Sequence, residues 1–130
     1  METLFEDKKA VIRFNEKTKA IELEWKEFVL IDDYKRIFIL GFDLFKKYRA
    51  KFLLSDIRKE GVVGPVGSKW LQNEMIPKAI ASGMKKVAII MNSDIFKEFY
   101  IKNLQKSVEE NEFMKYFDSI ETANNWLMEK

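Results

Sequence analysis

The chain of 130 residues contains neither cysteine nor histidine. It therefore cannot form a disulfide, a zinc site of the Cys/His type or a catalytic unit with a histidine base. Its 23 basic and 21 acidic residues leave a net charge of +2, which is too even a balance for a dedicated nucleic-acid-binding protein. The length and the 47% share of hydrophobic residues predict a single domain over residues 1–130. We expect neither a metal nor a cofactor.

The N-terminus is charged and lacks the apolar stretch of a secretory signal peptide. Charged residues interrupt every apolar stretch well before the roughly 18 residues that a membrane-spanning helix needs. We therefore expect a soluble, cytoplasmic protein without a transmembrane segment.

The first third of the chain predicts strands. Apolar and polar residues alternate over residues 9–16 and again over residues 19–28, which is the period of a half-buried strand. The polar residues 15–18 predict a short turn, so the two strands form a hairpin, and a further short strand is expected at residues 3–5. The hairpin leaves an unpaired strand edge, through which two copies of the chain could form a homodimer.

Residues 29–50 change to the helical period, because apolar side chains return every three or four positions. Asp32 in the first turn and Lys47 in the last turn follow the charge order that a helix dipole prefers. Gly41 lies in the middle of this helix, at a cost of about 1 kcal/mol relative to alanine. This glycine predicts that a neighbouring element packs closely against the helix.

A short apolar strand at residues 51–56 is followed by a loop that contains Gly61, Gly64 and Gly67. This glycine spacing matches neither the dinucleotide fingerprint nor the phosphate-binding loop. Two interpretations remain open: backbone N–H groups around Gly64 hold an anion at the start of the next helix, or the loop is a flexible connection.

The next predicted helix covers residues 67–82 and has four notable positions. Gly67 or Ser68 is expected to cap its N-terminus. Pro77 lies inside the helical pattern and predicts a kink or a break there. Gly83 is expected to end the helix.

The last third continues the alternation of strands and helices. Residues 85–91 are almost continuously apolar and predict a buried parallel strand. A helix over residues 94–108 and an edge strand over residues 113–117 follow. The chain ends in an amphipathic helix that begins with a capping box at Asp118 and is docked by Trp126. Together these elements predict an α/β fold: a mixed sheet with an N-terminal hairpin and about four helices.

Four segments, taken in order, resemble a known family: FLLSDIR, KWLQNEMIP, MKKVAIIM and YFDSIETANNWL. They resemble the STAS-like domains, a group that includes bacterial anti-sigma-factor antagonists and the cytoplasmic domains of sulfate transporters. The resemblance covers nearly the whole chain and is closest to an uncharacterised bacterial branch grouped with STAS and CRAL-TRIO lipid-binding domains. It implies a STAS-like sandwich and regulatory binding rather than catalysis.

The resemblance also implies a candidate phosphoacceptor. In the antagonists, a partner kinase phosphorylates a serine at the start of the helix that follows the strand ending in Asp and Leu or Ile. The Asp-Ser-Ser-Gly stretch of the antagonists is absent here, and Ser68, on a longer loop, is the nearby hydroxyl. A phosphate on Ser68 would lie at a helix N-terminus, where the dipole favours negative charge.

Asp56 and Arg58 are the first candidate binding residues. Side chains at positions i and i+2 of a strand point to the same side, and α/β sheets place ligands at the carboxyl ends of their strands. The pair could therefore bind a charged group. The alternative is a structural ion pair that anchors the loop after the strand.

Trp70 is the next candidate, at the start of the helix after the glycine loop. It could border a cavity between the helices and the sheet, together with Tyr34, Phe38, Leu71 and Met75. The alternative is that these residues belong to an ordinary core, whose edge Trp70 covers.

The sequence is therefore compatible with two functions. The first is a non-enzymatic regulatory module that binds a protein partner through residues 56–70, with Asp56, Arg58, Gly64, Ser68 and Trp70 as its binding residues. The alternative is a carrier of a small apolar ligand or lipid, which predicts a cavity on the order of a few hundred Å³ between helices and sheet, the size that drug-like ligands need. An enzyme that works with carboxylates alone is disfavoured, because no nucleophile is paired with a base.

Overall fold

The computed structural model describes residues 1–59, 65–94 and 113–129. These residues form one six-stranded sheet, whose strands lie side by side in chain order. Its strands are β1 (Glu2–Glu6), β2 (Ala10–Asn15), β3 (Ala20–Trp25), β4 (Phe52–Asp56), β5 (Lys86–Ile90) and β6 (Met114–Phe117). Gly61, Gly64 and most of the helix predicted over residues 94–108 lie outside the described residues.

The sheet is mixed, as predicted. β1, β2 and β3 are antiparallel neighbours, whereas β3, β4, β5 and β6 run parallel. The predicted hairpin is therefore confirmed as β2 and β3, with β1 added outside it. β1 and β6 are the two edges of the sheet. The predicted homodimer would therefore form through β1, the edge strand on the N-terminal side.

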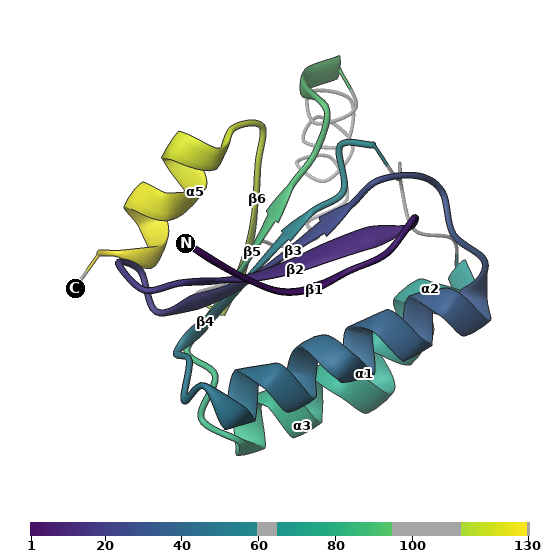
Figure 1. Cartoon of the computed structure of the whole chain (residues 1–130), viewed down its shortest axis with the longest axis horizontal. Coiled ribbons are helices and arrows are strands. Elements are labelled where there is room, and N and C mark those ends of the chain that lie inside the picture. The colour runs from purple at the N-terminus through teal and green to yellow at the C-terminus, as the bar shows by residue number, and fades with distance from the viewer. Residues whose placement is uncertain (60–64, 95–112, 130) are drawn as a thin grey trace, which may run out of the picture.

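Two helices, α1 (Ile31–Lys47) and α5 (Ile120–Leu127), confirm predicted helices. A third predicted helix is split into α2 (Pro65–Trp70), the π-helical turn η1 (Leu71–Met75) and α3 (Ile76–Ala81). Figure 1 shows α1, α2 and α3 on one face of the sheet and α5 on the other. This placement follows from parallel strands added in one direction, because right-handed crossovers then put their helices on the same face.

The kink or break predicted at Pro77 takes the form of the π-helical turn η1, which ends just before this proline. Proline has no N–H to donate within the helix, and the turn before α3 widens so that the Ile76 N–H donates to the Leu71 carbonyl, five residues back. The predicted capping by Gly67 or Ser68 is wrong, because α2 already begins at Pro65. Proline favours the first helical position, where its missing donor is not needed.

The predicted end of this helical stretch is also confirmed. Gly83 adopts a φ of 92°, a left-handed conformation that glycine adopts without steric cost. It lies just after the end of α3 and turns the chain into β5.

The predicted capping box at Asp118 is wrong by one residue. Ser119 is the N-cap of α5, and its side chain accepts a hydrogen bond of 3.2 Å from the backbone N–H of Thr122. The predicted docking by Trp126 is confirmed, since this side chain is buried against the ring of Phe117 at a centroid distance of 5.6 Å.

The described residues pack into a core on each face of the sheet. Because side chains alternate along a strand, Leu53 of β4 belongs to the larger core beneath α1. Its neighbour Leu54 belongs to the smaller core beneath α5. No helix among the described residues is long and apolar enough to cross a membrane.

Candidate functional site

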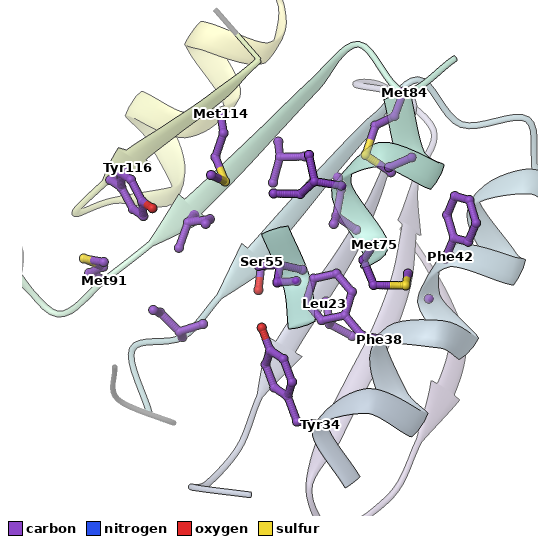
Figure 2. Close-up of a pocket in the computed structure, with 18 residues that line it drawn as sticks. Leu23, Tyr34, Phe38, Phe42, Ser55, Met75, Met84, Met91, Met114 and Tyr116 are labelled. Carbon is purple, nitrogen blue, oxygen red and sulfur yellow. The ribbon is translucent and has the colours of Figure 1, made fainter. Parts of the chain in front are cut away.

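A cavity lies in the larger core, between the sheet and the helices α1, η1 and α3 (Figure 2). The sheet contributes alternate residues of neighbouring strands, such as Leu53, Ser55 and Ile57 from the β4 segment. They share a face because the period of a strand is two residues. The complete described lining is Leu23, Tyr34, Phe38, Gly41, Phe42, Leu53, Ser55, Ile57, Leu71, Met75, Ile76, Ala79, Met84, Val87, Ile89, Met91, Met114 and Tyr116.

The cavity has a volume of about 150 Å³. Helix α1 covers it with Tyr34, Phe38, Gly41 and Phe42, positions that fall on one face of a helix with 3.6 residues per turn. Protein interiors leave few voids larger than a water molecule. A space of this size exceeds the voids that ordinary packing leaves, and it is partly open to the surface.

Gly41 lies where the helix leaves open space. A Cβ atom built on Gly41 would have no heavy atom of the described residues within 4 Å outside its own helix. The prediction that a neighbouring element packs closely against Gly41 is therefore wrong. The glycine faces the cavity instead, and alanine would fit there without a clash.

Among the described lining residues no side chain is charged, and three carry a hydroxyl group: Tyr34, Ser55 and Tyr116. The hydroxyl oxygen of Ser55 accepts a hydrogen bond of 3.2 Å from Nε1 of Trp25. Ser55 is 4% exposed, and Figure 2 shows its side chain extending from β4 towards the space beneath α1, with Tyr34 reaching towards the same region. The cavity is therefore largely apolar, and Ser55 is a polar position in its lining whose hydroxyl has an identified hydrogen-bond partner.

Four of the six methionines of the chain line the cavity: Met75, Met84, Met91 and Met114. Methionine side chains are flexible and polarisable, so they adapt to irregular spaces and contact aromatic rings favourably. A wall of this kind can adjust its shape around a small molecule.

A more open groove lies beside the cavity, along the outer surface between α1 and η1. Charged side chains, including Asp43, Lys46 and Glu74, line it together with Trp70. Because these charges keep the groove hydrated, it is less suited than the cavity to enclosing an apolar molecule.

Asp56 and Arg58 form the predicted pair. Oδ1 of Asp56 accepts hydrogen bonds from the backbone N–H of Arg58 at 3.1 Å and from its Nε at 2.9 Å, while Oδ2 accepts from Nη2 at 2.6 Å. The hydrogen bonds from the guanidinium to Asp56 raise the pKa of Arg58 above its ordinary value. Asp56 is 7% exposed, whereas the Arg58 side chain is 42% exposed.

This pair points away from the cavity. Asp56 shares its face of β4 with Leu54, which packs beneath α5, whereas Ser55 faces α1. The side-chain to backbone bond closes a turn of the kind that aspartate commonly forms. The geometry fits the interpretation in which the pair anchors the chain after β4.

The other predicted site residues do not gather at one place. Gly64 lies outside the described residues, and Ser68 has its backbone inside α2. Trp70 packs edge-on against Tyr34 and Phe38, with ring centroids 6.0 and 6.2 Å away. The residues named with Trp70 as a possible cavity border, Tyr34, Phe38, Leu71 and Met75, do line the cavity.

Sequence reasoning missed Ser55. It is the hydroxyl in the otherwise apolar stretch FLLS, and a polar side chain at a predicted buried position is a signal that could have identified it.

In residues 1–59, 65–94 and 113–129, no group of three or more acidic side chains is arranged to hold a metal ion.

Comparison with known proteins found no match among family models, curated proteins or solved structures. The resemblance to STAS-like domains therefore stays a prediction.

Proposed function

We propose that this protein is a non-enzymatic binding protein that carries a small apolar molecule in the cavity between the sheet and the helices α1, η1 and α3. The observation that supports this most is the unfilled space at Gly41, where a Cβ would meet no heavy atom of the described residues within 4 Å. Glycine inside a helix costs about 1 kcal/mol relative to alanine. Ligand binding explains a glycine at this position, because a larger side chain would occupy part of the space that the ligand fills.

The unfilled space also has an energetic cost. A fully enclosed empty space of 150 Å³ would cost about 3–4 kcal/mol, at roughly 24 cal/mol for each Å³, and this value is an upper bound because the cavity is partly open. This is a large part of the stability of a small domain, typically about 5–15 kcal/mol. A ligand that fills the cavity would recover part of this loss by restoring van der Waals contacts.

The volume sets the size of the ligand. Pockets for drug-sized molecules measure about 300–1,000 Å³, so the 150 Å³ cavity is smaller than the space predicted for a lipid carrier. An engineered apolar cavity of about this volume binds benzene or xenon. We therefore propose a ligand of about one ring rather than a long acyl chain.

Benzene titration of the whole chain, followed by thermal unfolding, tests this proposal. At ten times its Kd, benzene should stabilise the native state by about 1.4 kcal/mol. Replacing Gly41 by Ala and then by Leu should weaken benzene binding in steps, because each side chain takes up more of the cavity. Ile80→Ala is the control, since Ile80 is exposed on α3 and outside the described lining.

Two results would contradict the proposal. One is the absence of benzene stabilisation in the wild-type chain. The other is an equal benzene affinity in wild type and a folded Gly41→Leu variant, which would place the binding elsewhere.

A protein-binding module with its working surface at residues 56–70 remains the second candidate. The observation that favours it is the exposure of an apolar side chain near the start of α2: Val66 is 66% exposed. Arg58 also presents a half-exposed guanidinium. Val66→Asp should then abolish capture of a defined partner by the purified chain, whereas Ile80→Asp on α3 should not. Equal capture by both variants would rule this surface out.

A further inference from the structure

Within residues 1–59, 65–94 and 113–129, the hydroxyl group of Ser55 has a hydrogen without an acceptor. A serine hydroxyl carries one hydrogen to donate and two lone pairs to accept. Nε1 of Trp25 uses one of the lone pairs, at 3.2 Å. Among the described residues, nothing accepts the hydroxyl hydrogen of Ser55. Because Ser55 lines the cavity and is 4% exposed, a bound molecule is well placed to accept it.

Trp25 fixes the direction of this donor. Trp25 is fully buried, and it stacks on Tyr34 with a centroid distance of 5.3 Å and an interplanar angle of 20°. The packed indole holds its N–H on the Ser55 oxygen, so the hydroxyl hydrogen must point elsewhere. A pre-oriented donor adds specificity, because less conformational freedom is lost when a ligand binds.

The rest of the lining restricts the charge and the shape of the ligand. With no charged side chain among the described lining residues, an ionised ligand would lose its hydration without compensation. The thioethers of Met75, Met84, Met91 and Met114 make favourable contacts with the edges of aromatic rings. A flat, neutral ring therefore suits this cavity.

We propose that the ligand is a neutral aromatic heterocycle with one hydrogen-bond acceptor in its ring, and that Ser55 Oγ donates to this acceptor. The inference rests on the proposed function and adds the chemical class of the ligand. Trp25 acts as a positioning residue, because it orients the Ser55 hydroxyl without lining the described cavity itself.

Pyridine and benzene are the probes, since they have the same size and differ by one ring nitrogen. Their dissociation constants are measured by NMR titration at a pH where pyridine is neutral, for the wild-type chain and for Ser55→Ala. The ratio of the benzene Kd to the pyridine Kd should fall by about five- to tenfold in the variant, which is the net value of one hydrogen bond. The difference in hydration between the two probes cancels when this ratio is compared between the wild-type chain and the variant.

The outcomes separate the two proposals. If benzene and pyridine both fail to bind the wild-type chain, the proposed function itself is wrong. If benzene binds and the ratio changes by less than twofold in Ser55→Ala, the function stands and the hydrogen bond from Ser55 is refuted.

A measurement on the wild-type chain covers the case in which Ser55→Ala does not fold. Pyridine should shift the indole N–H signal of Trp25 more than benzene does, because linked hydrogen bonds polarise one another. The two rings have similar ring currents, and the indole signals of Trp70 and Trp126 serve as internal references. Equal shifts of the Trp25 signal with both probes would overturn the inference.

Discussion

The indole Nε1 of Trp25 donates a hydrogen bond of 3.2 Å to the hydroxyl oxygen of Ser55, and both side chains are buried. This bond joins β3 to β4 beneath the helix α1. Ser55→Ala should lower the free energy of unfolding by about 1–3 kcal/mol, because the buried N–H of Trp25 loses its acceptor. Urea denaturation monitored by tryptophan fluorescence measures this loss.

A double-mutant cycle isolates the contribution of the bond. In a Trp25→Phe background the donor is already absent, so Ser55→Ala should cost clearly less than it does in the wild-type chain. An equal cost in both backgrounds would mean that the hydrogen bond contributes nothing to stability.

Gly41 and Gly83 should respond in opposite ways to alanine. At both positions a Cβ would have no heavy atom of the described residues within 4 Å, but only Gly83 has a positive φ, of 92°. Gly41→Ala should stabilise the fold by up to about 1 kcal/mol, the difference in helix propensity. Gly83→Ala should destabilise it by about 1–3 kcal/mol, because alanine is strained in that conformation. Chemical denaturation measures the free energy of unfolding of both variants. Destabilisation by Gly41→Ala would show that the space at Gly41 is already filled.

The Asp56–Arg58 pair should be more sensitive to loss of the arginine. Arg58→Ala leaves a buried carboxylate without its cation, whereas Asp56→Ala leaves a guanidinium that can turn to water. We expect Arg58→Ala to cost about 1–3 kcal/mol and Asp56→Ala to cost less. Arg58→Lys should recover part of the loss, since lysine keeps the charge without the two-pronged geometry. Urea denaturation measures the free energy of unfolding of each variant. A larger loss in Asp56→Ala than in Arg58→Ala would contradict this interpretation.

The stability of the fold should depend on the ionisation of Asp33 in acid. Hydrogen bonds from Lys9 and from Arg36 hold the pKa of Asp33 below its ordinary value of 3.8. A lowered pKa means that this stabilisation is complete above the ordinary value and is lost as the pH falls through the lower, folded value. Asp33→Asn should therefore flatten the acid side of the stability profile, measured by urea denaturation between about pH 5 and 2.

Salt provides the control for this prediction. At 1 M salt the Debye length is about 3 Å, so the difference between wild type and Asp33→Asn should shrink. An acid profile that is equally steep in both proteins at low salt would exclude Asp33 as the source.

The elements that were predicted correctly depend on local patterns. The alternation of side chains along β2 and β3 and the helical period of α1 are each contained within one short stretch of sequence. Pro77 and Gly83 also act locally, through a missing donor and a positive φ. Such features can be predicted from the sequence because no distant residue is needed to produce them.

The cavity could be predicted only in part, because distant segments build it. Met84 precedes β5, Met91 follows it and Met114 begins β6, and no local pattern connects these three residues. Gly41 was misinterpreted for the same reason: its role depends on what lies opposite the helix. Only tertiary packing shows whether a glycine in a helix admits a neighbouring element or leaves a space.

The most direct test of the cavity as a ligand site is an NMR titration of the methionine methyl groups with benzene. We expect the signals of Met75, Met84, Met91 and Met114, which line the cavity, to shift together with one Kd. Met128, half exposed after α5, should stay unchanged. If the four signals do not move, or if only Met128 responds, the cavity does not bind small apolar molecules and the proposed function is wrong.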